Sequence, residues 1–276
     1  MSNAIQRQCL ARQGAENWAP WFGLVLAAVF AVPAPPFPAA YAAERVPFFE
    51  SRDIDVVPYA EHRTNTVAAT EEAATTWDDG PPLFGMDTEP LRAGNVLEKW
   101  SRANAEIARE LQALERCHFG GPCPADAQRL IDLSAEGAGR SGRARVGLIN
   151  RAVDRAISPV SDEAQWGVPD HWSAPFETLQ SGRGDCEDYA IVKYLALQEA
   201  GIPAGDLRIV VLKNAFPNED HAVVAARVDD QWLILDNRTL TLVRDMDLTR
   251  ATPEFMLDRQ GVRRFIAKDR SRRQVG

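Results

Sequence analysis

The sequence predicts an α+β domain in which helices come first and antiparallel strands follow. Apolar residues recur at helical spacing over 95–114, 124–133 and 143–157. Further along the chain, the pattern changes to short β runs at 207–212, 221–228 and 231–236. No internal repeat and no glycine-rich phosphate loop is present. This order of elements favours N-terminal helices packed on an antiparallel sheet.

Each predicted helix has a recognisable boundary. The helix at 95–114 is stopped by "HFGGPCP". Pro124 can begin the next helix because its missing N–H is no loss in a first turn. Ser158-Pro159 breaks the helix at 143–157, and the aromatic, acidic segment "DEAQWGVPDHWSAPFETL" that follows is predicted to be a loop.

The last two predicted strands form a hairpin through Asp229-Asp230, although Asp-Asp is a weaker turn signal than Asp-Gly. With a two-residue turn there, Val223 lies opposite Asp236. His221 is then on the same face as Asp236 and diagonal to it, at a backbone distance of ~7–8 Å that the two side chains can bridge. The hairpin register alone predicts a His-Asp pair.

Residues 1–42 are predicted to be a cleaved secretory signal peptide. Arg7 and Arg12 precede the apolar run "WFGLVLAAVFAV", and Ala40-Tyr41-Ala42 has the small-x-small form that signal peptidase accepts. The run is shorter than the ~20 apolar residues of a spanning helix. The alternatives are an uncleaved anchor and a wrongly assigned start codon. Residues 43–90 are predicted to be an extended or partly disordered lead-in, and 91–276 to be the domain.

The charge of the chain excludes one class of partner. The formal net charge is -8 at pH 7, and no block of basic residues occurs. Nucleic-acid binding normally requires a clustered positive face, so a nucleic-acid partner is not expected. A small or peptidic substrate, or a cation, suits this balance better.

Three cysteines follow the predicted signal peptide: Cys117, Cys123 and Cys186. Cys117 and Cys123 bracket a short glycine-containing loop and can close into a disulfide in an oxidising compartment. Half of a zinc site is the alternative, but no second Cys/His pair lies nearby. Cys186 is then the odd cysteine, predicted to be a free and reactive thiol.

Cys186 lies in "SGRGDCEDYAIVKY", between acidic residues. The glycines suit a tight turn and the apolar residues after it are helical, so Asp185 is a natural N-cap and Cys186 falls in the first turn. There the unpaired N–H groups and the helix dipole stabilise an anion and lower a thiol pKa. The same N–H groups can donate to an oxyanion in acyl transfer.

Cys186, His221 and Asp236 together form the Cys-His-Asp order of activated thiol nucleophiles. Each residue also has an ordinary structural interpretation: a helix-start cysteine, a solvated strand-end histidine and a turn aspartate. Their joint occurrence favours catalysis. His171 is the only substitute base, and Trp166 and Trp172 are candidates for lining the substrate cleft.

These motifs resemble a known family. "GRGDCEDYAIVKYLALQEAGIP", followed by "DHAVVAARVDDQWLILDN", is similar to the bacterial transglutaminase-like cysteine proteinases of the LapG type. The resemblance spans roughly residues 148–237 and includes "INRAV" and "WGVPDHWSAPFETL". It implies a papain-like or transglutaminase-like α+β fold, a catalytic triad of Cys186, His221 and Asp236, and dependence on calcium.

The resemblance also implies a biological role. LapG-type enzymes act in the periplasm, where they clip large surface adhesins near an N-terminal retention module and so release biofilm cells. The periplasmic domain of an inner-membrane cyclic-di-GMP receptor sequesters them. A large adhesin substrate, this receptor as partner and a periplasmic location are therefore expected here.

The carboxylates beside Cys186 are candidate calcium ligands. Calcium prefers carboxylate and carbonyl oxygens, so Asp185 and Glu187, with Asp188 as a weaker candidate, can hold it. Spacing alone favours the simpler interpretation of helix-start carboxylates stabilised by the dipole, and the family resemblance reverses that preference. Two other functions stay open: a different thiol-dependent amide hydrolase or acyl transferase, and a non-catalytic calcium-binding module.

Overall fold

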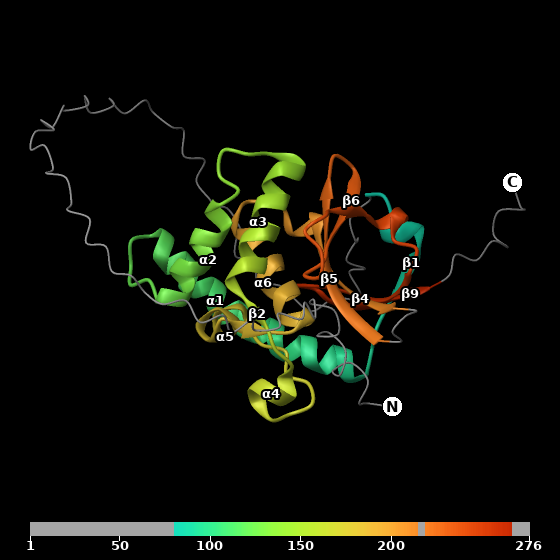
Figure 1. Cartoon of the computed structure of the whole chain (residues 1–276), viewed down its shortest axis with the longest axis horizontal. Coiled ribbons are helices and arrows are strands. Elements are labelled where there is room, and N and C mark those ends of the chain that lie inside the picture. Colours follow the sequence, from blue (N-terminus) through green and yellow to red (C-terminus); the bar gives the residue numbers. More distant parts are fainter. Residues whose placement is uncertain (1–79, 215–218, 267–276) are drawn as a thin grey trace, which may run out of the picture. The chain divides into compact units, whose positions relative to one another are not determined.

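Helices and sheet lie on opposite sides of the folded domain (Figure 1). The computed structural model describes residues 80–214 and 219–266. The predicted signal peptide and residues 43–79 of the predicted lead-in lie outside this range. Within it, no helix has the length and apolar character needed to cross a membrane.

The six α-helices of the described chain lie between residues 95 and 199. Their bounds are α1 (Asn95–His118), α2 (Ala125–Ala135), α3 (Gly142–Ala156), α4 (Asp162–Trp166), α5 (Pro175–Ser181) and α6 (Cys186–Glu199). The three helices predicted from periodicity correspond to α1, α2 and α3, and Pro124 is the N-cap of α2.

The structure places two short helices, α4 and α5, in the segment predicted to be a loop. The Ser161 side chain accepts a hydrogen bond from the Ala164 N–H at the start of α4, and Pro175 stands in the first turn of α5. Helices this short contain too few residues for apolar periodicity to reveal them. Their capping residues are the only local signal.

Seven strands form one sheet in the order β1-β9-β8-β4-β5-β6-β7, and β2 (Ser158–Pro159) pairs with β3 (Arg183–Gly184) separately. The pairings within the large sheet are antiparallel. Its strands are β1 (Asp87–Pro90), β4 (Leu207–Asn214), β5 (Glu219–Val228), β6 (Gln231–Leu235), β7 (Val243–Arg244), β8 (Ala251–Asp258) and β9 (Gly261–Ile266).

The predicted hairpin register between β5 and β6 is confirmed. Val224 pairs with Leu235 and Val228 with Gln231, as a turn at Asp229-Asp230 requires. Both aspartates have positive φ, 50° and 58°. A primed turn demands that conformation, because its twist matches that of the two strands.

Helix α6 is the centre of the domain. It packs against α2, α3, α5 and β5, and every residue from Cys186 to Leu197 is buried. A helix that is buried on all sides needs no polar face. On β5, Ala222, Val224 and Ala226 join this helical core.

The opposite face of the sheet has a smaller core of its own. Val223 and Ala225 of β5 contribute to it together with Leu83. Trp232 in β6 donates from Nε1 to the Pro81 carbonyl at 2.7 Å. Residues 80–90, predicted to be part of the lead-in, therefore pack into the domain as a cover and as edge strand β1.

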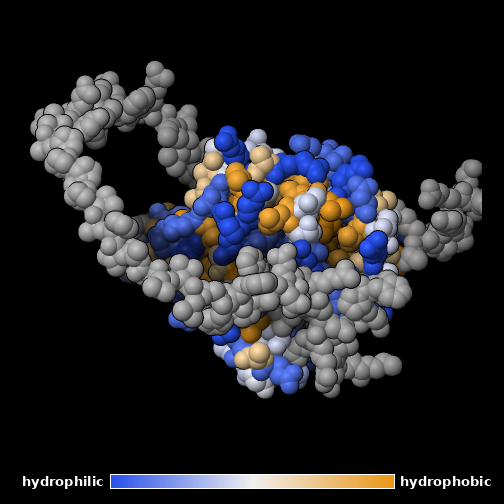
Figure 2. Space-filling model, in the orientation of Figure 1, coloured by the Kyte–Doolittle hydropathy of each residue, from blue (hydrophilic) through white to orange (hydrophobic). Residues whose placement is uncertain are grey.

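The surface in Figure 2 shows hydrophilic residues interspersed with apolar ones on the visible face.

Candidate active site

The turn before α6 positions the candidate nucleophile. Gly182 ends α5 in the left-handed conformation (φ 63°). A Cβ at Gly184 would lie 2.7 Å from the Cβ of Asp188, so no larger residue fits there without movement. Asp185 is the N-cap of α6, as predicted, and its N–H donates to Asp188 Oδ2 at 3.2 Å. Cys186 follows as the first helical residue.

Cys186 is buried, with 1% of its surface exposed. The Ala222 N–H on β5 donates to its Sγ at 3.5 Å, and Glu187 Oε2 lies 3.2 Å from the same sulfur. Cys186 is disulfide-bonded in the full chain, and no cysteine is free. The prediction of a free thiol concerns the chain without residues 1–42, and it stays a prediction. That prediction counted only the three cysteines after residue 42, whereas the whole sequence also contains Cys9, outside the described residues.

The predicted His-Asp pair is present. His221 Nε2 and Asp236 Oδ1 are 2.8 Å apart. Burial acts to raise the pKa of Asp236, but the hydrogen bond and charge of His221, with the N–H of Arg238, outweigh it and lower that pKa to about 2. Asp236 is therefore ionised at neutral pH and can only accept, so Nε2 carries the proton. Nδ1 of His221, buried and with no hydrogen-bond partner within the described chain, is left as the acceptor.

A narrow cavity joins the nucleophile to its candidate base. Cys186, His221 and Trp172 all line it. Trp172 also lines a second cavity of about 570 Å³ beside α1 and α5, so this residue borders both. His171 lies apart from the cysteine cavity, 38% exposed at its side chain, and pairs with Glu177 at 3.1 Å. Trp166 is partly exposed and packs on the His171 ring.

The three predicted metal ligands, Asp185, Glu187 and Asp188, are all buried. Burial, followed by the charge of Asp188, raises the pKa of Asp185 to about 8. Burial also raises the pKa of Glu187, with the charge of Asp185 as the next cause, and that of Asp188, with the charge of Glu187 next. Several carboxyl groups at close range therefore resist ionisation together.

Two further carboxylates, Asp162 and Asp170, belong to this cluster and were missed by sequence reasoning. One group of close carboxylate oxygens contains Asp162, Asp170 and Glu187, and a second contains Asp162, Asp185 and Asp188. In each group the oxygens lie within 4.8 Å of one another. Burial raises the pKa of Asp162 to about 6. The acidic character of "DEAQWGVPD" was the available signal, but only the fold of that segment brings it to α6.

The cluster suits a hard divalent cation. Its donors are all carboxylate oxygens, the ligands that calcium prefers. Asp185 Oδ1 and Asp170 Oδ1 are buried and accept no hydrogen bond from the described residues, so they are available to an ion. Asp188 is less suitable, because Oδ1 accepts from the Ser173 N–H (2.9 Å) and Oδ2 from the Asp185 N–H.

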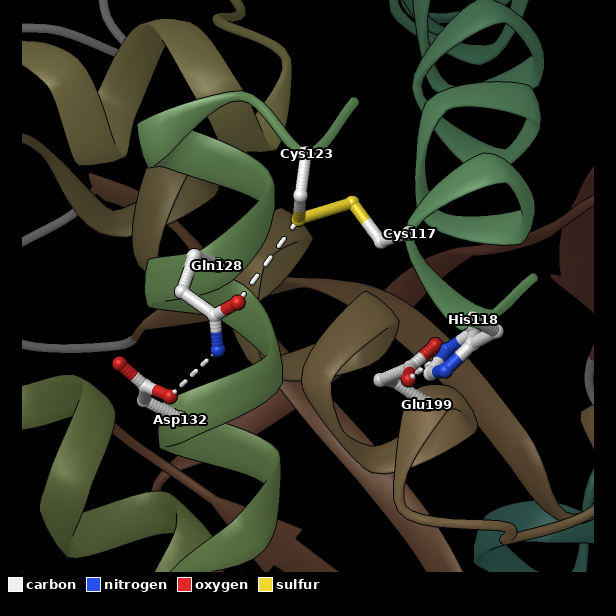
Figure 3. The surroundings of a disulfide bond; sticks show 6 residues. All are labelled: Cys117, His118, Cys123, Gln128, Asp132 and Glu199. Atoms are coloured by element: carbon white, nitrogen blue, oxygen red, sulfur yellow. Dashed lines mark hydrogen bonds and ion pairs between the residues drawn. A yellow bond between two sulfur atoms is a disulfide. The ribbon is translucent and has the colours of Figure 1, made fainter. Parts of the chain in front are cut away.

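Cys117 and Cys123, whose spacing allows a disulfide, form one, with a Cα–Cα distance of 4.7 Å. Figure 3 shows it closing the loop between α1 and α2, with Gln128 of α2 beside Cys123. Next to it, His118 Nε2 at the end of α1 lies 2.6 Å from Glu199 Oε1 at the end of α6.

Solved structures similar to this chain include LapG of Legionella pneumophila. The match has 21% sequence identity and a TM-score of 0.46, and covers 59% of this chain and 90% of LapG. A calcium-bound LapG structure matches with the same identity and TM-score, over 57% of this chain and 88% of that one. An EGTA-treated form matches over 58% and 86%. No curated protein matches the sequence.

The family comparison covers most of the described domain. Residues 129–260 match the bacterial transglutaminase-like cysteine proteinases. This segment runs from α2 to the turn between β8 and β9 and contains Cys186, His221 and Asp236. The predicted α+β, transglutaminase-like cysteine protease fold is thereby confirmed. Over residues 129–260, this chain is similar to the bacterial transglutaminase-like cysteine proteinase family.

Proposed function

We propose that the protein is a calcium-dependent periplasmic cysteine endopeptidase that cleaves the N-terminal region of a large surface adhesin and so controls release from biofilms. The observation that carries the proposal is that His221, hydrogen-bonded to Asp236, lines the same cavity as Cys186. Cys186 is the nucleophile, His221 the base and Asp236 the residue that orients His221.

The reaction uses Cys186 as a free thiol, the state predicted for the chain without residues 1–42. The thiol proton passes to His221 Nδ1, and the thiolate attacks the carbonyl carbon of the scissile peptide bond. The C–N bond then breaks as His221 returns the proton to the leaving amine. Water attacks the thioester with help from the same imidazole, which releases the acid product and restores the thiol.

Backbone N–H groups at the start of α6 favour both the thiolate and the oxyanion. Glu187 opposes the thiolate, because its Oε2 lies 3.2 Å from the sulfur. Bound calcium would supply positive charge that offsets these carboxylates. Asp162, Asp170, Asp185 and Glu187 would hold it, and this arrangement accounts for calcium dependence through the electrostatics of the nucleophile.

The substrate, partner and location belong to the same proposal. The predicted signal peptide supports export to the periplasm. The family resemblance supports a large adhesin as substrate and the periplasmic domain of an inner-membrane cyclic-di-GMP receptor as the partner that sequesters the enzyme. The acidic balance of the chain agrees with a protein or cation partner and not with nucleic acid.

Cleavage of the N-terminal region of an adhesin from the same cell tests the activity. The reduced protein is incubated with this fragment in calcium or in a chelator, and products are followed by mass spectrometry. Wild type should cleave the fragment in calcium and leave it intact in chelator. Cys186→Ala should leave it intact in both. The matched control is Cys117→Ser/Cys123→Ser, which removes the other described thiols and should still cut. If folded wild type leaves every such fragment intact in calcium, the proposed protease activity is refuted.

The calcium site has a separate test. Asp185→Asn and Glu187→Gln should each weaken the rise in thermal stability that calcium produces in wild type. Asp162→Asn should do the same, since Asp162 is common to both groups of close oxygens. If all three variants gain as much stability as wild type on addition of calcium, the ion binds elsewhere.

A further inference from the structure

Lys99 supplies a buried positive charge at the acidic cluster from a distant part of the chain. It lies in the second turn of α1, and only 5% of its surface is exposed. Its Nζ forms an ion pair with Asp170 Oδ2. Lysine is rarely buried unless it is paired, because its charge is costly to remove from water. Asp170 is thus the reason that Lys99 is tolerated there.

Asp170 is also one of the carboxylates that suit a cation. One of its carboxylate oxygens lies within 4.8 Å of one carboxylate oxygen of Asp162 and one of Glu187. The charge of Lys99 also acts on Asp162, where it is one of the influences that lower the pKa against the effect of burial. A divalent ion held by these oxygens would share Asp170 with an ammonium group, and the two positive charges would repel at close range.

The surroundings of Lys99 include an aromatic ring and open space. Nζ lies 5.9 Å from the centre of the Trp172 ring, a distance suited to a cation–π contact. Lys99, Asp170 and Trp172 line the cavity of about 570 Å³, so there is space into which the ammonium group can move. Trp172 in turn lines the narrow cavity with Cys186.

We propose that Lys99 is a built-in counter-cation of the acidic cluster, which holds Asp170 through Oδ2 in the absence of calcium and is repelled from it when calcium binds at Oδ1. Lys99 therefore weakens calcium binding and sets the concentration at which the site fills. This inference rests on the calcium site of the proposed function. Because the displaced ammonium group moves within a cavity bordered by Trp172, filling of the site also changes the wall of the nucleophile's cavity.

Lys99→Met tests the inference by removing the charge while retaining an unbranched side chain. Calcium binding to the whole protein is measured by isothermal titration calorimetry, with folding checked by circular dichroism. Lys99→Met should bind calcium at least about tenfold more tightly than wild type, because one repulsive charge is lost. Arg102→Met is the matched control, since Arg102 lines the same cavity one turn further along α1 and forms no described ion pair with the cluster.

Equal or weaker calcium binding by folded Lys99→Met would overturn the inference, and so would equal tightening by Arg102→Met. A wild type that binds no calcium would instead refute the calcium site of the proposed function. If wild type binds calcium and the variant binds no better, only the role of Lys99 fails.

Wild type provides a second measurement that does not depend on folding of the variant. Reductive methylation of Lys99 is followed by mass spectrometry in calcium and in chelator. Lys193 is the internal reference, because its side chain is 1% exposed and pairs with Asp154. Labelling of Lys99 relative to Lys193 should rise in calcium. No change, or a fall, would contradict displacement of Lys99.

Discussion

The protonation state of His221 depends on Asp236. The carboxylate has a pKa of about 2 and accepts from Nε2, which leaves Nδ1 without a proton in the neutral ring. Asp236, directly after β6, thus sets the tautomer of the base that serves the nucleophile. Orientation of the imidazole and its proton placement come from the same hydrogen bond.

Asp236→Asn should therefore abolish most activity without unfolding the protein. The amide can donate to Nε2 and so favour a proton on Nδ1, the wrong tautomer, with an expected fall in kcat of about 10²–10⁴-fold. The rate at which iodoacetamide alkylates reduced Cys186 at neutral pH should also fall. Asp247→Asn is the control, since Asp247 lies on the surface and pairs with Arg244. Wild-type alkylation and cleavage rates in Asp236→Asn would contradict this role.

Glu110, which is not one of the catalytic residues, should make the stability of the fold depend on pH. Burial raises its pKa from 4.5 to about 8, against the hydrogen bond from the Phe176 N–H. Because the folded-state pKa is the higher one, the folded protein binds the proton more tightly. The stability so gained is complete below about pH 4.5 and is lost as the pH rises through about 8.

Glu110→Gln removes this titration and can still accept from Phe176. Its free energy of unfolding relative to wild type should increase by roughly 2 kcal/mol between pH 5 and pH 9, less than the full shift because the group is partly exposed. Urea denaturation at the two pH values measures it. Glu163→Gln, at an exposed position of α4, is the control. A constant difference between Glu110→Gln and wild type would show that the carboxyl titrates normally.

At the scale of elements, the β5–β6 hairpin places His221 and Asp236. A slip of one residue would turn Asp236 to the other face of the sheet. The turn that prevents it is formed by Asp229 and Asp230, two non-glycine residues with positive φ. Such residues are strained relative to asparagine and glycine in a primed turn.

Asp229→Asn/Asp230→Gly should stabilise the protein by about 1 kcal/mol while keeping the register, because it relieves that strain. The melting temperature should rise, and cleavage activity should stay at the wild-type level. A lower melting temperature would mean that the aspartate side chains stabilise the turn through contacts that outweigh the strain.

At the scale of the whole molecule, the segment before residue 91 completes the second core. Leu83 is buried with Val210, Val223 and Phe265, and β1 pairs with β9 at the edge of the sheet. The cover comes from the start of the described chain, and the sheet from its end. The second core is therefore formed by residues that are far apart in the sequence.

A chain of residues 91–276 should therefore be less stable than one of residues 43–276 by at least about 3 kcal/mol, since it exposes apolar surface of several side chains and removes an edge strand. Guanidinium denaturation of both chains tests this expectation, and a chain of residues 80–276 should retain the stability that 91–276 lacks. Equal stability of the two shorter chains would mean that residues 80–90 only rest on the sheet.

The sequence by itself was enough for the elements that local periodicity and turn chemistry specify. Helices α1, α2, α3 and α6 and the register of β5 with β6 were predicted. The spacing of Cys117 and Cys123 allowed the disulfide but left open whether it forms. The pair of His221 with Asp236 followed from that register, because side chains alternate along a strand with a period of two.

Only the tertiary structure could bring Asp162, Asp170 and Lys99 to the carboxylates of α6. Together with the carboxylates of α6, these residues lie on three separate segments, and no local pattern encodes how α1 and the α4–α5 segment pack around α6. The burial that raises the carboxyl pKa values is likewise a property of the packed domain. Chemistry within one element is readable in the sequence, whereas the charge environment of the nucleophile depends on contacts between elements.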